Sequence, residues 1–208
     1  MNFEFAIKGL VIGLAIAAPV GPIGVLCIRR TLADGRLIGL LTGLGAAAAD
    51  GVYGAIAAFG LTAVTDLLIG QGPWLGLIGG LFLCYLGVRT FMAVSAGPAA
   101  PARSGALFVI FSSTFVLTLT NPTTILSFVA IFAGLGLGNT GGDYFAASLM
   151  VAGVFLGSAL WWVGLSGAVS VLRTRVGPRA LRAINRLSGL LIGGFGVGAL
   201  AFGALALG

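Results

Sequence analysis

One carboxylate, Asp50, lies within an uncharged stretch of small and apolar residues, GLGAAAADGVYGAIAAFG (residues 43–60). No basic residue in this stretch can pair with it. A buried carboxylate can bind and release a proton, or pair with a cationic group of a ligand. The structural alternative is a hydrogen-bonded acid at a helix contact, because the neighbouring glycines allow close packing. Tyr53 lies about one helical turn beyond Asp50, so it is spaced to donate a hydrogen bond into any cavity that Asp50 faces.

Two proline-containing segments interrupt otherwise apolar runs. They are Pro19-Val20-Gly21-Pro22 and Asn121-Pro122-Thr123-Thr124. Proline removes a backbone donor and strains the preceding helical turn. A discontinuous helix therefore presents unpaired amides and a positive dipole end, which can hold a carboxylate, and free carbonyls, which can hold a cation. A packing kink at each proline is the alternative, because proline is more frequent in membrane helices than in soluble ones.

A later apolar run supplies further polar side chains, Ser158 and the adjacent Trp161 and Trp162. We consider Ser158 and Trp161 as candidates for contact with a substrate. Tryptophan is also enriched at membrane interfaces, so anchoring there is the alternative role for at least one of the two rings.

The composition indicates a membrane protein. Of the 208 residues, 59% are hydrophobic and 8% are charged, whereas a globular domain is roughly 45–50% apolar and about 25% charged. The formal charge of +6 comes mainly from arginines in short connections, where it sets topology, so no nucleic-acid partner is expected. There is no histidine, and Cys27 and Cys84 lie inside apolar runs. A disulfide framework, a metal site and a cofactor are therefore not expected.

Apolar runs long enough to cross a bilayer of about 30 Å recur along the chain. We expect six membrane-spanning helices, the fourth of them broken or kinked at Asn121-Pro122. The runs cover residues 9–28, 37 to about 65, 74 to about 96, 104–142, 144–172 and 187 to the C-terminus. The first run has features of a signal peptide, but it continues to Arg29-Arg30 and is long enough to span, which favours a membrane helix.

Basic residues alternate along the connections between these runs. The first, third and fifth connections carry arginines, whereas the second and fourth carry only Asp66 and Asp143. Cytoplasmic loops are rich in Lys and Arg, so the arginine-bearing connections are predicted to face the cytoplasm and both termini the opposite side. The fifth connection holds arginines at positions 173, 175, 179, 182 and 186.

Two halves of three helices each would insert in opposite orientations, as in inverted-repeat transporters. The chain is predicted to be a single transmembrane domain, residues 1–208. Repeat one covers about 1–96, a linker covers 97–103, and repeat two covers about 104–208. The helix breaks then fall in the first helix of each repeat, which favours a shared binding site between them.

Taken together, these motifs resemble the LysE/RhtB group of amino-acid exporters over nearly the whole chain. The matching segments are Pro19-Val20-Gly21-Pro22, Gly43 to Gly51 ending in Asp50-Gly51, Gly79 to Arg89, and Leu119 to Leu126. The resemblance implies a multi-pass protein of the bacterial inner membrane that exports amino acids or similar small molecules. It also implies coupling to the proton or membrane potential, and it allows a homodimer. Many members have lysine after the Asn-Pro pair, where this chain has Thr123, so the resemblance indicates no specific substrate.

The leading hypothesis is a secondary exporter that works by alternating access. The helix breaks near Pro22 and Asn121-Pro122 would bind the small-molecule substrate, and Asp50 would couple ions or engage an ammonium group. A membrane thiol oxidoreductase that uses Cys27 and Cys84 is one alternative. A divalent-cation transporter is another, although one buried aspartate and no histidine make a poor cage. Enzymatic hydrolysis is not expected, because the chain has no histidine base and no pair of buried carboxylates.

Overall fold

The structure, a computed structural model, describes residues 3–19, 21–60, 70–93, 104–135, 143–173 and 175–207. Those residues form helices and short connections, without a strand among them. The helices are α1 (Phe3–Ala17), α2 (Pro22–Asp34), α3 (Arg36–Ala58), α5 (Gly72–Phe91), α6 (Ser104–Leu119), α7 (Pro122–Leu135), α8 (Tyr144–Arg173) and α9 (Pro178–Leu207). The predicted all-helical class is confirmed for this part of the chain. The predicted linker at 97–103 and the connection with Asp66 lie outside the described residues.

Four helices, α3, α5, α8 and α9, are each long and apolar enough to cross a membrane. The number rises to six if α1 with α2, and α6 with α7, each count as one span. The chain bends by 78° between α1 and α2 and by 59° between α6 and α7. The two proline segments therefore lie where two apolar runs change direction sharply, and the described helices provide four to six candidate spans.

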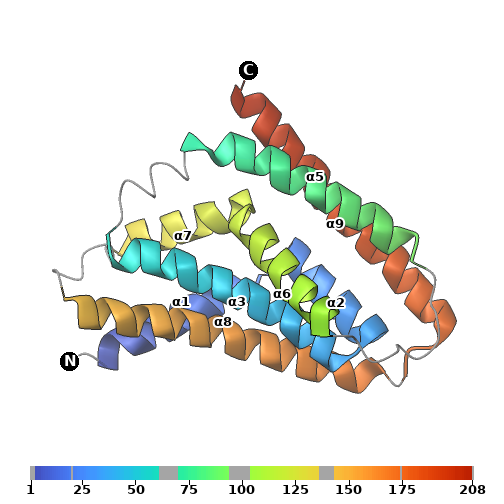
Figure 1. The fold of residues 1–208 in the computed structure, drawn as a ribbon, viewed down its shortest axis with the longest axis horizontal. Coiled ribbons are helices and arrows are strands. Elements are labelled where there is room, and N and C mark those ends of the chain that lie inside the picture. Colours follow the sequence, from blue (N-terminus) through green and yellow to red (C-terminus); the bar gives the residue numbers. More distant parts are fainter. Residues whose placement is uncertain are drawn as a thin grey trace.

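The helices form two groups (Figure 1). In the larger group α1 and α3 both pack along α8, and α6 packs along α3. The second group is the pair α5 and α9, which lie side by side as an arm and diverge from the rest of the bundle toward the C-terminus. Helix α2 joins the two groups, because it contacts α3 and α8 on one side and α9 on the other.

Glycines allow α1 and α8 to approach closely. Gly9 and Gly13 on α1 meet Gly153 and Gly157 on α8. A methyl group at any of these four positions would collide with a backbone carbonyl of the other helix. Small residues spaced four apart are typical of tightly packed membrane helices, so the first helix of the chain is held mainly by one that comes much later.

A second glycine contact joins α5 and α9. Gly189, Gly196 and Gly203 follow one another at seven-residue intervals, which keeps them on one side of α9. A Cβ atom at Gly196 would lie 2.7 Å from the backbone nitrogen of Cys84, and one at Gly189 would lie 2.6 Å from that of Phe91. The two backbones therefore touch along most of the arm.

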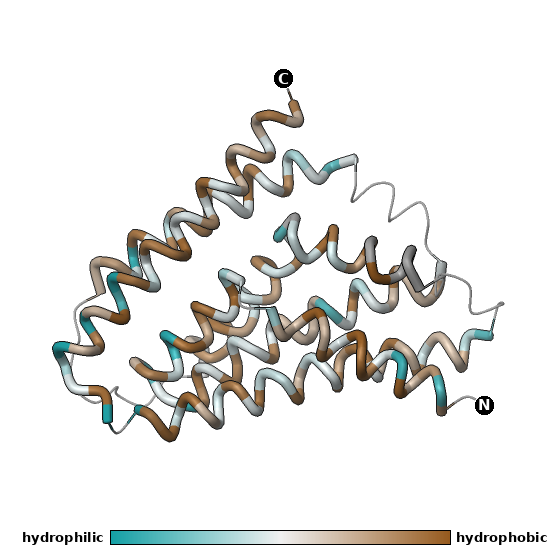
Figure 2. The backbone as a smooth tube through the Cα atoms, turned by 180° about the vertical axis from the view of Figure 1, so that it is seen from behind, coloured by the Kyte–Doolittle hydropathy of each residue, from teal (hydrophilic) through white to brown (hydrophobic). Residues whose placement is uncertain are grey.

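The outer surface of the bundle is apolar. Figure 2 shows hydrophobic stretches along the helices, with many of the hydrophilic positions near helix ends. Large apolar side chains such as Leu81, Leu190 and Val197 are exposed. Exposed apolar surface on this scale is appropriate to a protein surrounded by lipid.

Boundaries beside basic residues differ from the prediction. The first run is predicted to end at residue 28, with Arg29, Arg30 and Asp34 in the connection, but α2 extends to Asp34 and includes all three. The sequence predicts the last span from residue 187, with Arg179, Arg182 and Arg186 in a connection, but α9 begins at Pro178 and includes all three. Proline is favoured at the first helical position and arginine is a good helix former. The hydropathy of the sequence indicates where a helix enters the membrane. The helix itself can begin earlier, in a polar segment.

We expect Gly196→Ala to lower the thermal stability of the purified protein in detergent. The added methyl would force α5 and α9 apart, and overpacking of this kind costs about 1–3 kcal/mol. Gly193→Ala is the matched control, because a Cβ atom there meets nothing within 4 Å. Equal unfolding midpoints for the two variants would show that backbone contact does not hold the arm together.

Candidate functional site

A cavity of about 230 Å³ lies where the two helix breaks meet α3 and α8. Residues from both breaks line it, namely Pro19, Gly21 and Pro22 from the first and Asn121, Thr123 and Thr124 from the second. Asp50 on α3 and Trp162 on α8 line it as well. Residues from three separate sequence motifs therefore share one enclosure, which we call the central cavity.

Asp50 accepts a hydrogen bond from one neutral donor, which in turn accepts from another. Its side chain is buried, at 3% exposed, and Ser158 Oγ donates to its Oδ2 at 2.6 Å. Trp162 Nε1 in turn donates to Ser158 Oγ at 3.2 Å. The ion pairs among the described residues are Lys8–Glu4 and Arg29–Asp34, so within that part of the chain Asp50 has no cationic partner. A carboxyl group in this setting can receive a proton or a cationic ligand from the cavity.

The first break leaves backbone groups without helical partners. Pro22 lacks an N–H, so the carbonyl of Ala18 cannot receive the usual bond from four residues ahead. At the start of α2, Gly21 provides no side-chain cap. The amides of Ile23 and Gly24 lie in the first turn, where a helix contains no acceptor for them. Both residues line the central cavity.

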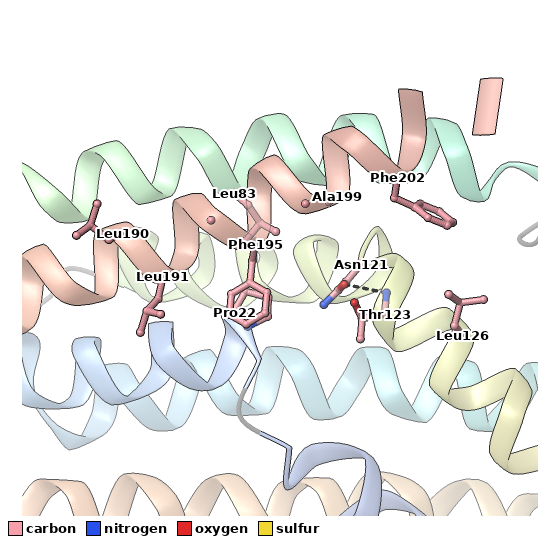
Figure 3. A pocket seen from close by; sticks show the side chains of 12 residues that line it. Pro22, Leu83, Asn121, Thr123, Leu126, Leu190, Leu191, Phe195, Ala199 and Phe202 are labelled. Carbon is pink, nitrogen blue, oxygen red and sulfur yellow. Dashed lines mark hydrogen bonds between the residues drawn. The ribbon is translucent and has the colours of Figure 1, made fainter. Parts of the chain in front are cut away.

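The second break is satisfied by its own neighbours. Asn121 Oδ1 accepts from the Thr123 amide at 3.1 Å (Figure 3), and the Asn121 carbonyl accepts from the Thr124 amide at 3.0 Å. Tyr53 donates its hydroxyl to the carbonyl of Leu119 at 2.6 Å. In a continuous helix that carbonyl would accept from Thr123. Asn121 therefore caps the amide end of α7, and Tyr53 caps the carbonyl end of α6.

A larger cavity, of about 550 Å³, lies between α9 and the two breaks (Figure 3). Pro22, Asn121, Thr123 and Phe195 line both cavities, so the two adjoin. The remaining walls of the larger cavity are mainly apolar side chains of α9 and α5. Together the two spaces provide a polar centre with an apolar extension beside the arm.

The comparisons with known proteins identify the family of the chain. The family described as LysE type translocator matches residues 14–202. The chain belongs to the LysE type translocator family. It is accordingly a transmembrane transporter of that family, and its identification by resemblance is confirmed.

Relatives of this translocator occur in several bacteria. It is 29% identical to "Putative amino acid efflux protein YcgF" of Bacillus subtilis, over 89% of this chain and 91% of the relative. It is 30% identical to "Uncharacterized membrane protein YahN" of Escherichia coli, over 81% and 76%. It is 29% identical to "Putative amino-acid transporter YggA" of Aeromonas salmonicida, over 98% of both chains. No solved structure matches the chain.

Three predicted site residues, Tyr53, Ser158 and Trp161, do not line the central cavity, although Ser158 donates to Asp50, which does. The ring of Tyr53 packs tilted against that of Phe128, with centroids 5.2 Å apart, and its hydroxyl donates to the carbonyl of Leu119 at the second break and not to Asp50. Trp161 is partly buried against a hydrophobic cluster, whereas its neighbour Trp162 lines the cavity. Pro122 is the first residue of α7.

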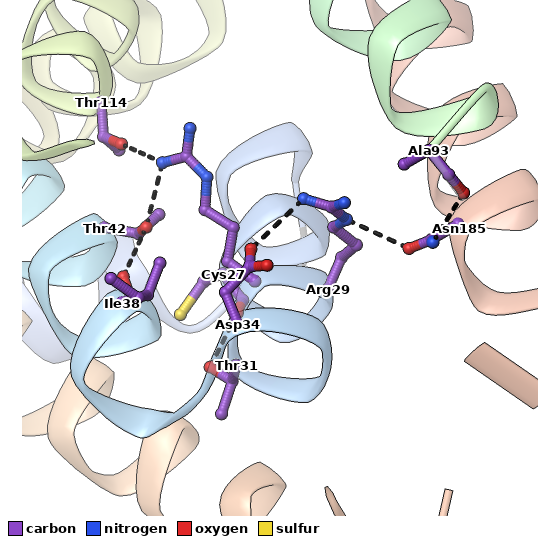
Figure 4. Close-up of polar contacts among 10 residues, drawn as sticks. Cys27, Arg29, Thr31, Asp34, Ile38, Thr42, Ala93, Thr114 and Asn185 are labelled. Atoms are coloured by element: carbon purple, nitrogen blue, oxygen red, sulfur yellow. Dashed lines mark hydrogen bonds and ion pairs between the residues drawn. The ribbon is translucent and has the colours of Figure 1, made fainter. Parts of the chain in front are cut away.

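The structure also contains a polar cluster that sequence reasoning missed. Arg30 Nη1 donates to Thr42 Oγ1 at 3.0 Å and to Thr114 Oγ1 at 3.2 Å, which ties α2 to α3 and α6 (Figure 4). Thr42 lies one turn before the cavity residue Ala46, and Thr114 one turn before Thr118. The spacing of Thr114 and Thr118 on one helical face was the available signal, but Arg30 was interpreted only as a topogenic charge.

The two thiols of the translocator are free and contact different partners. Cys27 Sγ donates to the carbonyl of Gly39 at 3.4 Å, and Cys84 Sγ donates to that of Gly193 at 3.9 Å. Within the described ranges, no group of three or more His, Cys, Asp or Glu side chains is arranged to hold a metal ion. These observations favour neither the thiol oxidoreductase nor the cation transporter.

We expect Tyr53→Phe to destabilise the protein without changing the central cavity. Loss of the hydroxyl leaves the carbonyl of Leu119 without its donor, and an unsatisfied buried acceptor costs about 1–3 kcal/mol. Thermal unfolding in detergent measures the effect. Tyr144→Phe is the control, because Tyr144 is 76% exposed. The capping role would be refuted by a Tyr53→Phe variant that unfolds at the wild-type temperature.

Proposed function

We propose that this protein is a secondary exporter of amino acids or similar small solutes across the bacterial inner membrane, and that it works by alternating access. The observation that carries the proposal is the meeting of Asp50 with both helix breaks in one cavity of about 230 Å³. Pockets for drug-sized ligands are roughly 300–1,000 Å³, so this space suits a smaller solute. The names of the Bacillus and Aeromonas relatives, which refer to amino acid efflux and transport, support the substrate class.

The two charged ends of an amino acid have complementary partners in the central cavity. The ammonium group pairs with Asp50, the buried carboxyl that faces the space. The carboxylate binds at the start of α2, where the amides of Ile23 and Gly24 and the positive end of the helix dipole favour an anion. Gly24 has no side chain to shield its amide. The start of α7 is less suitable, because Asn121 already occupies the amide of Thr123.

Asp50 also provides a means of coupling to the proton gradient. A proton and a substrate ammonium compete for the same carboxyl group, so binding of one disfavours the other. Exchange of the two at opposite sides of the membrane would link solute export to proton entry. Ser158 supports both states, because a hydroxyl can donate to a carboxylate and accept from a carboxylic acid.

The contacts of Arg30 close the central cavity on the side predicted to face the cytoplasm. They lie one helical turn from the cavity lining on both α3 and α6, toward the arginine-bearing connections. Entry of solute from the cytoplasm therefore requires that Arg30 releases Thr42 and Thr114. Both acceptors are neutral, which makes this release less costly than the separation of a buried ion pair.

The inverted repeat and the six-span topology belong to the same proposal. Repeat one comprises α1 with α2, α3 and α5, and repeat two comprises α6 with α7, α8 and α9. The packing supports this division: α1 packs along α8 as α6 packs along α3, and the last helices, α5 and α9, pack on each other. With six spans, both termini lie outside the cytoplasm.

Transport by purified protein in proteoliposomes, with a panel of neutral, acidic and basic amino acids, tests this function. We expect uptake or efflux of at least one solute by the wild type. Asp50→Asn should reduce the rate at least about tenfold, a difference of about 1.4 kcal/mol. Asn cannot hold a negative charge or exchange a proton at neutral pH.

Asp143→Asn is the matched control for this measurement. Asp143 Oδ1 caps α8 by accepting from the amides of Phe145 and Ala146, at 2.9 Å and 3.0 Å, and an asparagine oxygen can do the same. The control should transport at the wild-type rate. If Asp50→Asn transported as well as wild type across a pH series, Asp50 would have no coupling role. If the wild type moved none of the panel, the substrate class would be wrong.

A further inference from the structure

A third cavity, of about 670 Å³, lies between α2 and α5. Its lining combines three arginines, Arg29, Arg30 and Arg89, with apolar side chains of both helices. It shares no lining residue with the central cavity or with its apolar extension. We call this space the arginine cleft.

The arginine cleft carries an excess of positive charge. Arg29 Nη1 lies 3.5 Å from Asp34 Oδ2, an ion pair at the edge of the cleft. Among the described residues, the hydrogen bonds of Arg30 go to threonine hydroxyls, and Arg89 donates to the hydroxyl of Tyr85 at 3.0 Å. Arg29 and Arg89 therefore bring two guanidinium groups to the cleft, with the charge of Arg30 nearby, against one carboxylate among the described residues, and the cleft favours an anion.

Arg29 is positioned by a buried amide. Its Nε donates to Asn185 Oδ1 at 3.1 Å, and Asn185 Nδ2 donates to the carbonyl of Ala93 at 3.2 Å (Figure 4). Asn185 is 2% exposed, so this link between α2, α9 and the end of α5 is shielded from solvent. A guanidinium group that is already held in place loses less conformational entropy when it binds an oxyanion.

The other wall of the cleft is apolar and open. Val88 on α5 and Met92, the residue that caps its C-terminal end, line the cleft and are 59% and 71% exposed. Arg89 lies in the last turn of α5, at the end predicted to face the cytoplasm. Guanidinium groups beside an exposed apolar helix face suit an amphiphile whose anionic head lies at the interface. Basic pockets between membrane helices on the cytoplasmic side bind such headgroups.

We propose that the arginine cleft binds the phosphate of an anionic phospholipid, with Arg29 and Arg89 as its oxyanion donors and an acyl chain along Val88 and Met92. Guanidinium groups bind phosphate oxygens in a paired, directional manner, which favours phosphate over a diffuse attraction to the membrane surface. The inference does not depend on the transported solute, because the two proposed donors, Arg29 and Arg89, do not line the central cavity and take no part in the Arg30 contacts that close it.

Thermal unfolding of the full chain in detergent tests the proposal. The purified protein is titrated with phosphatidylglycerol, phosphatidylcholine or sodium phosphate, since a ligand that binds only the native state raises the unfolding midpoint. We expect phosphatidylglycerol to raise the midpoint most. Arg29→Gln/Arg89→Gln should need at least about tenfold more of this lipid for the same rise. Arg179→Gln/Arg182→Gln loses the same charge on α9 and should respond as wild type.

Native mass spectrometry provides a second readout, the number of phosphatidylglycerol molecules retained. Arg89→Gln alone should reduce this number, and it is the safer variant because Arg89 is exposed and contacts only Tyr85 among the described side chains. The proposal is overturned if phosphatidylcholine stabilises as well as phosphatidylglycerol, or if the α9 double variant loses as much binding. An equal response to sodium phosphate at the same concentration would show that the ligand is a free anion and not a lipid.

Discussion

Within hydrocarbon, every backbone N–H and C=O must find a partner inside the protein, and this constraint decides what a broken membrane helix can be used for. The two breaks of this chain meet the constraint differently. At the second break, Asn121 and Tyr53 supply the missing partners. At the first, Gly21 provides no side-chain cap, although its amide donates to the carbonyl of Pro19 at 2.9 Å, and the start of α2 lines a cavity. Side chains therefore cap the second break, whereas among the described residues no side chain caps the start of α2 at the first.

The glycines around Asp50 show that its structural and functional interpretations are compatible. A Cβ atom at Gly43 would collide with the side chain of Trp162, and one at Gly45 with the carbonyl of Phe111 on α6. Gly43 lets α3 approach Trp162 on α8, the helix whose Ser158 donates to the carboxyl group. Ser158 in turn accepts from Trp162, one helical turn further along α8. Small residues on α3 therefore allow a neutral donor on another helix to reach the buried acid.

Much of this site could be predicted from residue types, because a lone acid and paired prolines are costly in a membrane and need a reason to be present. The choice between neighbouring residues depends on which face of the helix each one occupies. Trp161 and Trp162 are adjacent, and adjacent residues point about 100° apart, so composition could not select between them. The spacing of Ser158 and Trp162, four residues apart, was the better indicator. Tyr53 follows Asp50 at a similar spacing, yet Phe128 and the carbonyl of Leu119 determine where its ring lies. Arg30 was missed because its acceptors come from two other helices.

The interlocked glycines of α1 and α8 have a consequence for biogenesis. Helix α1 leaves the ribosome first, but the helix that fills its glycine face is synthesised only after more than half of the chain. Until then, among the described helices, that face lacks the partner on which its glycines pack. Insertion therefore passes through a state in which the glycine face of α1 is covered by lipid or by the insertion machinery. The contact between α1 and α8 forms only after α8 has been synthesised.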